Sequence, residues 1–491
     1  MKILIANRGE IAVRLIRACH EMGLEAVAVY TDLDAYSLHV RLADEVVPLG
    51  EKTGYLQIEK VLKAAQKAKA DAIHPGYGFL SENADFAQAV EKAGLIFIGP
   101  RPETIALLGD KLASRRAAIE AGLPVLPGSQ DALPREVPFA LAESVKYPVL
   151  VKAAAGGGGR GIRLARSAGE LQEVVDAARK EAEASFGDGT VFLESMVQQA
   201  RHIEVQILGD GRGNVLCLGE RECSIQRRRQ KLIEESPAPD LPEELRYQLY
   251  DAAFRLGKAL NYRSLGTVEF LVDPNRQYHF IEVNPRIQVE HPVTEWVTGL
   301  DLVREQISLA LSGRLPHQQA HITLQGSAIE ARVLAEDSEA GFMPSSGTIT
   351  YVKEPGGPGI RVDSDLYQGM AVSAAYDSLL AKVIAWGENR TSAIQRLRRG
   401  LAEFQIGGIK TDLAFLLKVI ESPPFVAGEV TTTYLDNFQP TITVWDESLE
   451  KELALVAAMY IHKQHANITN ENLPVSLWKQ TAWREQMPGK E

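Results

Sequence analysis

The chain has 491 residues, 45% of them hydrophobic, and its 53 lysines and arginines stand against 64 acids, which gives a net charge of −11. This length suits about three domains with sizeable cores, and the acidic balance argues against a nucleic-acid or membrane-surface binder. Three widely spaced cysteines without metal-ligand spacing fit a reducing compartment. A strand-like run begins at Met1, and no apolar stretch reaches the roughly 18 residues that span a bilayer. We therefore expect a cytoplasmic protein with neither a targeting segment nor a membrane span.

The first hundred residues alternate between strand and helix patterns. We predict helices over residues 10–21, 58–68 and 82–93, between strands at 2–6, 25–30, 72–74 and 95–98. Strand–helix–strand units at this spacing are typical of a parallel sheet. The single glycine at position 9 makes no dinucleotide-binding fingerprint, so this region carries no cofactor prediction of its own.

A glycine-rich loop over residues 153–161 follows a proline-rich linker at 124–138. Strand-like runs at 147–152 and 162–166 flank the loop, and a helix is predicted to start only near Glu170. This context excludes a Rossmann fingerprint, and no Gly-Lys-Ser/Thr follows to make a Walker A motif. Glycine N–H groups can approach phosphate oxygens closely. We therefore expect a mobile lid over a nucleoside triphosphate, with a flexible hairpin tip as the alternative.

Basic residues gather shortly after two strand-like runs at residues 191–194 and 201–208. The cluster consists of Arg227, Arg228, Arg229 and Lys231. Such a run is usually a solvated face. Because it precedes a candidate metal site, we expect it to neutralise phosphate instead.

That metal site is a pair of carboxylates in a predicted hairpin. The hairpin strands are 266–272 and 278–284. Their turn places Glu269 opposite Glu282, where like charges are destabilising. Period-2 alternation puts Glu282 and Asn284 on one face, with Ile281 and Val283 on the other. Two carboxylates and an amide oxygen suit Mg²⁺ arriving with a phosphorylated substrate; the alternative is a surface hairpin whose acids point into water.

Five segments together resemble one family of enzymes. They are Arg8–Ile11, His74–Asn83, Gly109–Lys111, Glu220–Gln226 and Pro285–Glu295. In this order they resemble the biotin carboxylase family of ATP-grasp enzymes, from Met1 to about Leu435. The resemblance implies an α/β fold with a Rossmann-like (pre-ATP-grasp) N-terminal domain, an ATP-grasp domain with a mobile glycine-rich lid, and a mixed α/β C-terminal domain. The expected bounds are 1–113, 114–312 with the lid at about 124–196, 313–440, and a tail at 441–491.

The implied reaction is the ATP-dependent carboxylation of biotin by bicarbonate, through carboxyphosphate. It needs two Mg²⁺ ions, for which Mn²⁺ can substitute. Multidomain relatives carry a biotin-accepting Met-Lys-Met, and this sequence has none. We therefore expect biotin to arrive on a separate biotin carboxyl carrier protein, with carboxyltransferase subunits as further partners and a homodimer as the assembly. The favoured final acceptor is acetyl-CoA, as in fatty acid biosynthesis, and propionyl-CoA and pyruvate carboxylases are the alternatives.

The resemblance also assigns site residues by position. The expected nucleotide contacts are Lys111, Lys152, Gly158, Gly159, Glu194, Ser195, Met196, Val197, His202, Gln226, Arg229, Glu269, Leu271 and Glu282. The expected metal ligands are Glu269, Glu282 and Asn284. The bicarbonate residues are Lys231, Arg286, Gln288, Val289 and Glu290, and the biotin residues are Tyr77, Arg286 and Arg332. Lys231, Arg286, Glu290 and Arg332 are the expected catalytic residues, with Glu290 as the base and Arg332 stabilising the biotin enolate.

Some positions depart from the family pattern. Arg229 stands where a histidine is usual, and Ala155 replaces a lid glycine. Cys223 lacks a base beside it in sequence, so we expect inert packing. An amphipathic helix marked by Leu449, Leu453, Val456 and Tyr460 is expected to dock a partner protein. The rival interpretations are another ATP-grasp carboxylate–amine ligase and an inactive scaffold protein of a carboxylase complex.

Overall fold

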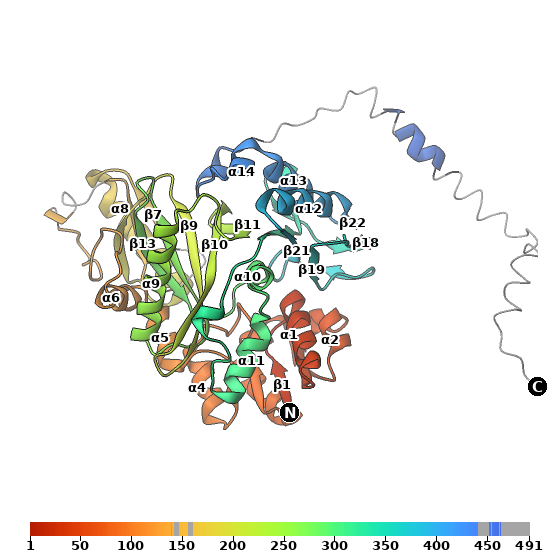
Figure 1. Cartoon of the computed structure of the whole chain (residues 1–491), viewed down its shortest axis with the longest axis horizontal. Coiled ribbons are helices and arrows are strands. Elements are labelled where there is room, and N and C mark those ends of the chain that lie inside the picture. The colour runs from red at the N-terminus through yellow and green to blue at the C-terminus, as the bar shows by residue number, and fades with distance from the viewer. Residues whose placement is uncertain are drawn as a thin grey trace, which may run out of the picture. The chain divides into compact units, whose positions relative to one another are not determined.

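The computed structural model describes residues 1–138, 140–141, 147–155, 161–439, 451–452, 454–460 and 462 (Figure 1). The chain divides into two units, Met1–Phe438 and Gln439–Glu491. Among the described helices, none combines the length and the apolar character needed to cross a bilayer.

The N-terminal region forms the predicted parallel sheet. Its strands lie in the order β3-β2-β1-β4-β5. They are β1 (Lys2–Ile5), β2 (Glu25–Thr31), β3 (Glu45–Gly50), β4 (Ala72–His74) and β5 (Ile96–Phe97). The sequence did not indicate β3, because only two apolar side chains of this edge strand, Val47 and Leu49, are buried.

The three helices predicted in this region are α1 (Gly9–Glu21), α3 (Ile58–Ala68) and α4 (Ala84–Lys92). Three further helices, α2 (Leu38–Leu42), α5 (Pro102–Gly109) and α6 (Lys111–Glu120), were not predicted. Helix α4 begins two residues later than residue 82, where we predicted its start, because the Asn83 side chain accepts a hydrogen bond from the Phe86 N–H and caps the helix. Asp110 caps α6 in the same way, which fixes Lys111 at the first helical position.

A small antiparallel sheet, β7-β6-β8, carries the expected strand–loop–strand. It consists of β6 (Val149–Ala153), β7 (Ile162–Ala165) and β8 (Val191–Ser195), and α8 (Ala168–Phe186) packs on it. The helix starts close to the predicted Glu170. Gly158 and Gly159 lie outside the described residues, so the lid loop between the strands stays a prediction.

The third sheet has eight antiparallel strands in the order β13-β12-β9-β10-β11-β14-β21-β19. Their bounds are β9 (Arg201–Asp210), β10 (Val215–Arg227), β11 (Gln230–Ser236), β12 (Arg263–Val272), β13 (Tyr278–Asn284), β14 (Ser327–Leu334), β19 (Ile360–Ser364) and β21 (Leu379–Gly387). Pairing of β11 with β14 joins strands that precede and follow residue 312 into one sheet. That continuity was not visible in the sequence.

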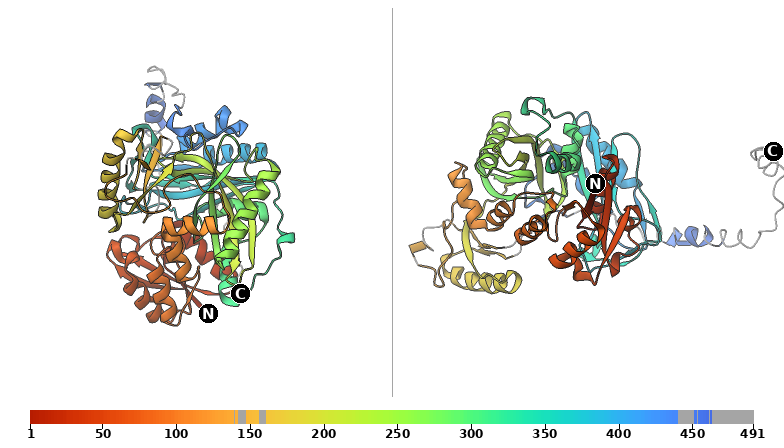
Figure 2. Two further views of the ribbon diagram at one scale, coloured as in Figure 1. Left: turned by 90° about the vertical axis from the view of Figure 1, so that its left-hand side faces the viewer. Right: turned by 90° about the horizontal axis from the view of Figure 1, so that it is seen from below.

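Helices cover this large sheet from several sides (Figures 1 and 2). Helix α9 packs against β9 and β10, and α12 packs against β14 and β21. The helices are α9 (Glu243–Ala259), α10 (His291–Thr298), α11 (Leu302–Ser312), α12 (Arg390–Glu403), α13 (Leu413–Glu421) and α14 (Pro423–Ala427). Short strands complete the mixed α/β region: β15 (Glu336–Asp337), β16 (Met343–Pro344), β17 (Gly347–Thr348), β18 (Tyr351–Lys353), β20 (Ala371–Val372) and β22 (Gln405–Gly407).

The hairpin of β12 and β13 has the predicted register and one irregularity. Glu269 pairs with Glu282 as expected, but Phe270 then pairs with Phe280, so Ile281 is the extra residue of a β-bulge. Val283 is buried on the core side, as predicted. Strict alternation is wrong for Ile281, because the bulge turns this residue toward the cavity described below.

The second unit is described in part. Residues 451–452, 454–460 and 462 are helical. Of the four residues predicted to mark its apolar face, Val456 and Tyr460 are exposed, as are Leu455 and Met459. Leu449 and Leu453 lie outside the described residues.

Candidate active site

A cavity of about 1250 Å³ lies between the small sheet, the large sheet and the N-terminal region. It gathers nearly all the predicted site residues that the structure describes. Those lining it are Tyr77, Lys111, Lys152, Glu194, Ser195, Met196, Val197, His202, Gln226, Arg229, Lys231, Glu269, Leu271, Glu282, Asn284, Arg286, Gln288, Val289 and Arg332. Glu290 is the exception, and it lies buried behind the cavity wall.

The two opposed carboxylates differ in their surroundings. Glu269 Oε1 accepts from Lys231 Nζ at 3.0 Å and from Asn284 Nδ2 at 2.8 Å, and Oε2 lies 3.0 Å from His202 Nε2. Burial alone would raise the pKa of Glu269, but the Lys231 and His202 charges outweigh it and hold the pKa well below its usual range. Within the described part of the chain, the Glu282 carboxylate has no hydrogen-bond donor. Burial and the Glu269 charge raise its pKa.

This asymmetry fits a divalent cation. A half-buried carboxylate without a donor among the described residues, beside a second carboxylate and an amide, offers the hard oxygen ligands that Mg²⁺ prefers. Asn284 Oδ1 meanwhile accepts from Arg286 Nη2 at 3.2 Å. Glu269, Glu282 and Asn284 are therefore the residues that could hold a metal ion.

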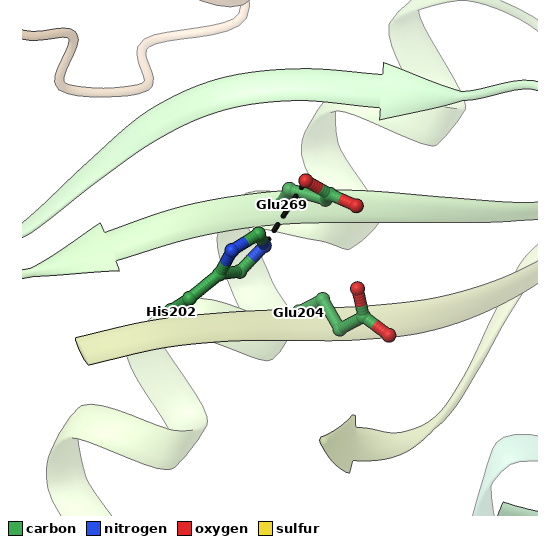
Figure 3. Close-up of side chains that lie close together, drawn as sticks. All are labelled: His202, Glu204 and Glu269. Atoms are coloured by element: carbon green, nitrogen blue, oxygen red, sulfur yellow. Dashed lines mark ion pairs between the residues drawn. The ribbon is translucent and has the colours of Figure 1, made fainter. Parts of the chain in front are cut away.

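Glu204, which the sequence analysis did not single out, lies directly beside this pair. It is the neighbour of Glu269 on strand β9, and His202, Glu204 and Glu269 converge on one face of the sheet (Figure 3). Glu204 is fully buried and accepts from Lys231 and from the Arg221 guanidinium. The alternation of His202, Glu204 and Gln206 within an apolar strand was the signal that could have found it.

Lys231 connects the acid pair, Glu269 and Glu282, to the buried carboxylate of Glu290. Its Nζ donates to Glu204 Oε2 at 2.5 Å, Glu269 Oε1 at 3.0 Å and Glu290 Oε1 at 2.6 Å. The other oxygen of Glu290 accepts from Arg332 Nη2 at 2.9 Å. Burial would raise the pKa of Glu290, but Lys231 and Arg332 hold it well below its ordinary value. Glu290 is thus ionised and fully paired.

Arg286 and Gln288 are further polar residues that line the cavity next to Glu269. Arg286 Nη1 donates to Gln288 Oε1 at 2.9 Å, and its Nε lies 3.3 Å from Glu82 Oε1. Gln288 Nε2 lies 3.2 Å from Glu269 Oε1. Three cations, Lys231, Arg286 and Arg332, therefore face the cavity beside the acid pair, an arrangement suited to a small anion.

The other end of the cavity is more apolar and has two lysines. Its apolar surface suits the planar ring of a nucleotide base. The apolar residues that line it are Leu150, Ile162, Phe192, Met196, Leu271 and Phe280. Lys152 pairs with Glu194, and burial lowers the pKa of Lys111. Gln226 Nε2 lies 2.9 Å from His202 Nδ1.

The predicted basic cluster is divided by a tight turn between β10 and β11. Arg228 and Arg229 occupy it with φ of 49° and 65°, and both line the cavity with Lys231. Arg227 instead lies over the Phe342 ring, 3.8 Å from its centroid. The structure therefore does not bring Arg227 to the cavity. Cys223 is buried, and burial raises its thiol pKa well above the usual value, which agrees with inert packing.

Comparison with known proteins decides the family. Three domain families match: "Biotin carboxylase, N-terminal domain" over residues 1–105, "Carbamoyl-phosphate synthase L chain, ATP binding domain" over 110–318, and "Biotin carboxylase C-terminal domain" over 330–437. Biotin carboxylase 1 of Bacillus subtilis is 48% identical over 442 residues, which cover 89% of this chain and 98% of that protein. The chain belongs to the biotin carboxylase family. It is accordingly an ATP-dependent ligase that carboxylates biotin.

Other members of the family show the same extent of similarity. A pyruvate carboxylase subunit of Methanothermobacter thermautotrophicus is 44% identical over 456 residues, 92% of each chain. The Campylobacter jejuni biotin carboxylase–β,γ-ATP complex superposes with a TM-score of 0.87 at 45% identity, covering 89% of this chain and 98% of that one. The biotin carboxylase domain dimer of Hydrogenobacter thermophilus 2-oxoglutarate carboxylase, with MgADP, ADP and bicarbonate, gives 0.86 at 45%, covering 89% and 97%.

Proposed function

We propose that the cavity binds MgATP and bicarbonate side by side and delivers the carboxyl group to biotin on a separate carrier protein. The observation that carries this proposal is the position of Lys231, whose Nζ contacts both Glu269 of the acid pair and Glu290. One cation thus borders the metal–nucleotide site and the anion site together. Two reactants held in adjoining sites need little further positioning to react.

At the nucleotide end, Lys111 and Lys152 would contact the phosphates while Glu269, Glu282 and Asn284 hold Mg²⁺. A metal ion held by these residues would supply positive charge that offsets the charge of the phosphate groups. For Lys152 to reach a phosphate, it must leave Glu194, its present partner. The apolar end formed by residues such as Met196 and Leu271 would take the base.

At the anion end, Arg286, Lys231, Gln288 and the Val289 N–H would hold bicarbonate. Glu290 takes its proton, and a bicarbonate oxygen attacks the γ-phosphorus as the bond to the β–γ bridging oxygen breaks, giving ADP and carboxyphosphate. Lys231 and Arg332 make the free Glu290 a weak base. An anion that draws these cations toward itself raises the basicity of Glu290, so proton transfer is favoured only when substrate is bound.

Biotin would lie near Tyr77 and Arg332. Carboxyphosphate splits into CO₂ and phosphate, the phosphate removes the N1′ proton of biotin, and Arg332 stabilises the enolate that attacks CO₂. A preorganised donor of this kind is typically worth roughly 10²–10³ in rate.

The proposal also includes the partner proteins and the final acceptor of the carboxyl group. We infer a biotin carboxyl carrier protein, carboxyltransferase subunits and a homodimer, with the exposed helix of the second unit docking one of these partner proteins. Acetyl-CoA is the acceptor that we favour. Pyruvate is the second candidate, because the chain matches the pyruvate carboxylase subunit of Methanothermobacter thermautotrophicus over 92% of both lengths. A cytoplasmic location remains a prediction.

Steady-state ATP hydrolysis tests the proposal. Turnover should require bicarbonate and rise when free biotin is added, and amine acceptors should have no effect. Stimulation by an amine in place of biotin would instead indicate a carboxylate–amine ligase. A folded protein without biotin-dependent hydrolysis would point to an inactive scaffold protein.

A further inference from the structure

A fully buried lysine lies behind the anion end of the cavity. Lys382 on β21 is 0% exposed, and its Nζ donates to the Val289 carbonyl oxygen at 2.8 Å. The same Nζ lies 3.2 Å from Glu10 Oε1 and 3.8 Å from Asp363 Oδ2. Val289 belongs to the loop that carries Gln288 and Glu290, so Lys382 holds the backbone of this loop from behind.

Glu10 connects the same lysine to the opposite wall. It lies on α1, is 4% exposed, and its Oε1 also accepts from the Tyr77 hydroxyl. Tyr77 lines the cavity. The path Val289–Lys382–Glu10–Tyr77 therefore joins three segments that are far apart in sequence, from the N-terminal sheet region, the loop before α10, and β21.

Stability alone does not account for this arrangement. Removing a lysine and a glutamate from water costs several kcal/mol per ion, and apolar replacements of buried ion pairs are often neutral or stabilising. Glu10 Oε2 is also buried and has no hydrogen-bond partner among the described residues, an additional cost. What the pair does supply is a fixed geometry between the Val289 backbone and the Tyr77 hydroxyl.

We propose that Lys382 and Glu10 are positioning residues that fix the bicarbonate loop and Tyr77 relative to each other, so that CO₂ forms within reach of biotin. This inference rests on the proposed function, because it takes residues 286–290 as the bicarbonate loop and Tyr77 as part of the biotin site. Neither positioning residue touches the reacting atoms. Their contribution is to the placement of two substrates rather than to the binding of the nucleotide.

The test compares Lys382→Met and Glu10→Gln with a matched control. Arg246→Met removes a cation from Glu220, another buried acid, whose Oε1 lies 2.8 Å from Arg246 Nε; neither residue lines the cavity. For each variant, the KM values for bicarbonate and free biotin, MgADP affinity by calorimetry, and amide hydrogen exchange over residues 286–290 are measured.

Lys382→Met should raise the KM for bicarbonate and for biotin by roughly tenfold each, the loss expected for one charged hydrogen bond. MgADP affinity should stay within about twofold of the wild type, and amide exchange in the loop should become faster. Glu10→Gln keeps the side-chain size and leaves Lys382 on Val289, so it should raise mainly the KM for biotin. Arg246→Met should change neither KM.

The inference is overturned if Lys382→Met and Glu10→Gln both keep wild-type KM values and loop exchange while only the active fraction falls, as in the control. Should Lys382→Met fail to fold, an unchanged biotin KM in Glu10→Gln overturns it equally. A wild type without biotin-dependent turnover contradicts the proposed function instead. The exchange data then still show whether Lys382 holds the loop.

Discussion

Glu282 lies directly opposite Glu269 across β12 and β13, and yet among the described residues only Glu269 has cationic partners at hydrogen-bond distance. Burial and the neighbouring charge raise the pKa of Glu282, while Lys231 and His202 keep Glu269 ionised. The Glu282 carboxylate is therefore less well neutralised than that of Glu269. We interpret this difference as the electrostatic attraction that is available to a metal ion bound together with the nucleotide.

Glu282→Gln should separate stability from function. The amide removes a like-charge contact between opposed strand residues, which is worth roughly 0.2–1 kcal/mol, so the ligand-free protein should unfold at the same or a higher temperature. The rise in melting temperature caused by MgADP should largely disappear. A variant that keeps the full MgADP-induced shift would show that Glu282 does not hold the metal ion.

The turn between β10 and β11 is a second place where we expect a substitution to raise the stability of the fold and lower its affinity for ATP. Positive φ at both Arg228 and Arg229 is the geometry of a two-residue turn that favours Asn-Gly. Replacing the pair by Asn-Gly should stabilise the protein by about 1 kcal/mol in urea unfolding. ATP affinity should fall, because two cations leave the cavity wall. Unchanged ATP affinity would mean that these arginines do not serve the nucleotide.

The buried Glu234 leads us to expect that the stability of the fold depends on pH. It lies opposite Glu330 on the neighbouring strand, and burial raises its pKa to about 7. Between its usual pKa of about 4.3 and this value, the folded state holds a proton that the unfolded state has lost. Stability from this group is therefore present at low pH and is lost as the pH rises toward 7.

Glu234→Gln removes this titration. The melting temperature of the variant relative to the wild type should be higher at pH 8 than at pH 5. Glu59→Gln, at an exposed glutamate on α3, is the control and should show no such trend. A difference between Glu234→Gln and the wild type that stays constant from pH 5 to 8 would contradict the assignment.

Truncation after Asn437 tests the second unit. The first unit ends at Phe438 and contains every residue that lines the cavity. Carboxylation of free biotin should therefore be retained within about twofold, because only groups at the reacting centre change the chemical step. Co-purification with carrier and transferase subunits should weaken. Full assembly of the truncated chain would exclude a docking role for residues 439–491.

Local patterns predicted local structure well. The bounds of α3 and β4 agree with the predicted ranges 58–68 and 72–74, since buried runs and helical periodicity act over short distances. The opposition of Glu269 and Glu282 followed from the turn alone. No sequence pattern indicated the bulge at Ile281. The alternation of inward and outward side chains applies to a regular strand and does not predict where an extra residue is inserted.

Contacts between distant segments were less predictable. Glu204 and Lys382 are charged residues in apolar strands, and their partners lie on other strands or helices. The sequence separation of 372 positions between Glu10 and Lys382 gives no hint that they meet. Of the predicted basic cluster, Arg227 alone lies away from the cavity, because the turn at Arg228 directs Arg227 to Phe342 and Lys231 to Glu269.

Transfer of labelled bicarbonate to free biotin, in the presence of MgATP, measures the central claim directly. The wild type should form labelled carboxybiotin. Glu290→Gln should fold and bind ATP but lose this activity by roughly 10²–10⁴, the usual contribution of a positioned base. Carboxybiotin formation at a near-normal rate in that variant would show that the buried carboxylate between Lys231 and Arg332 is not the base.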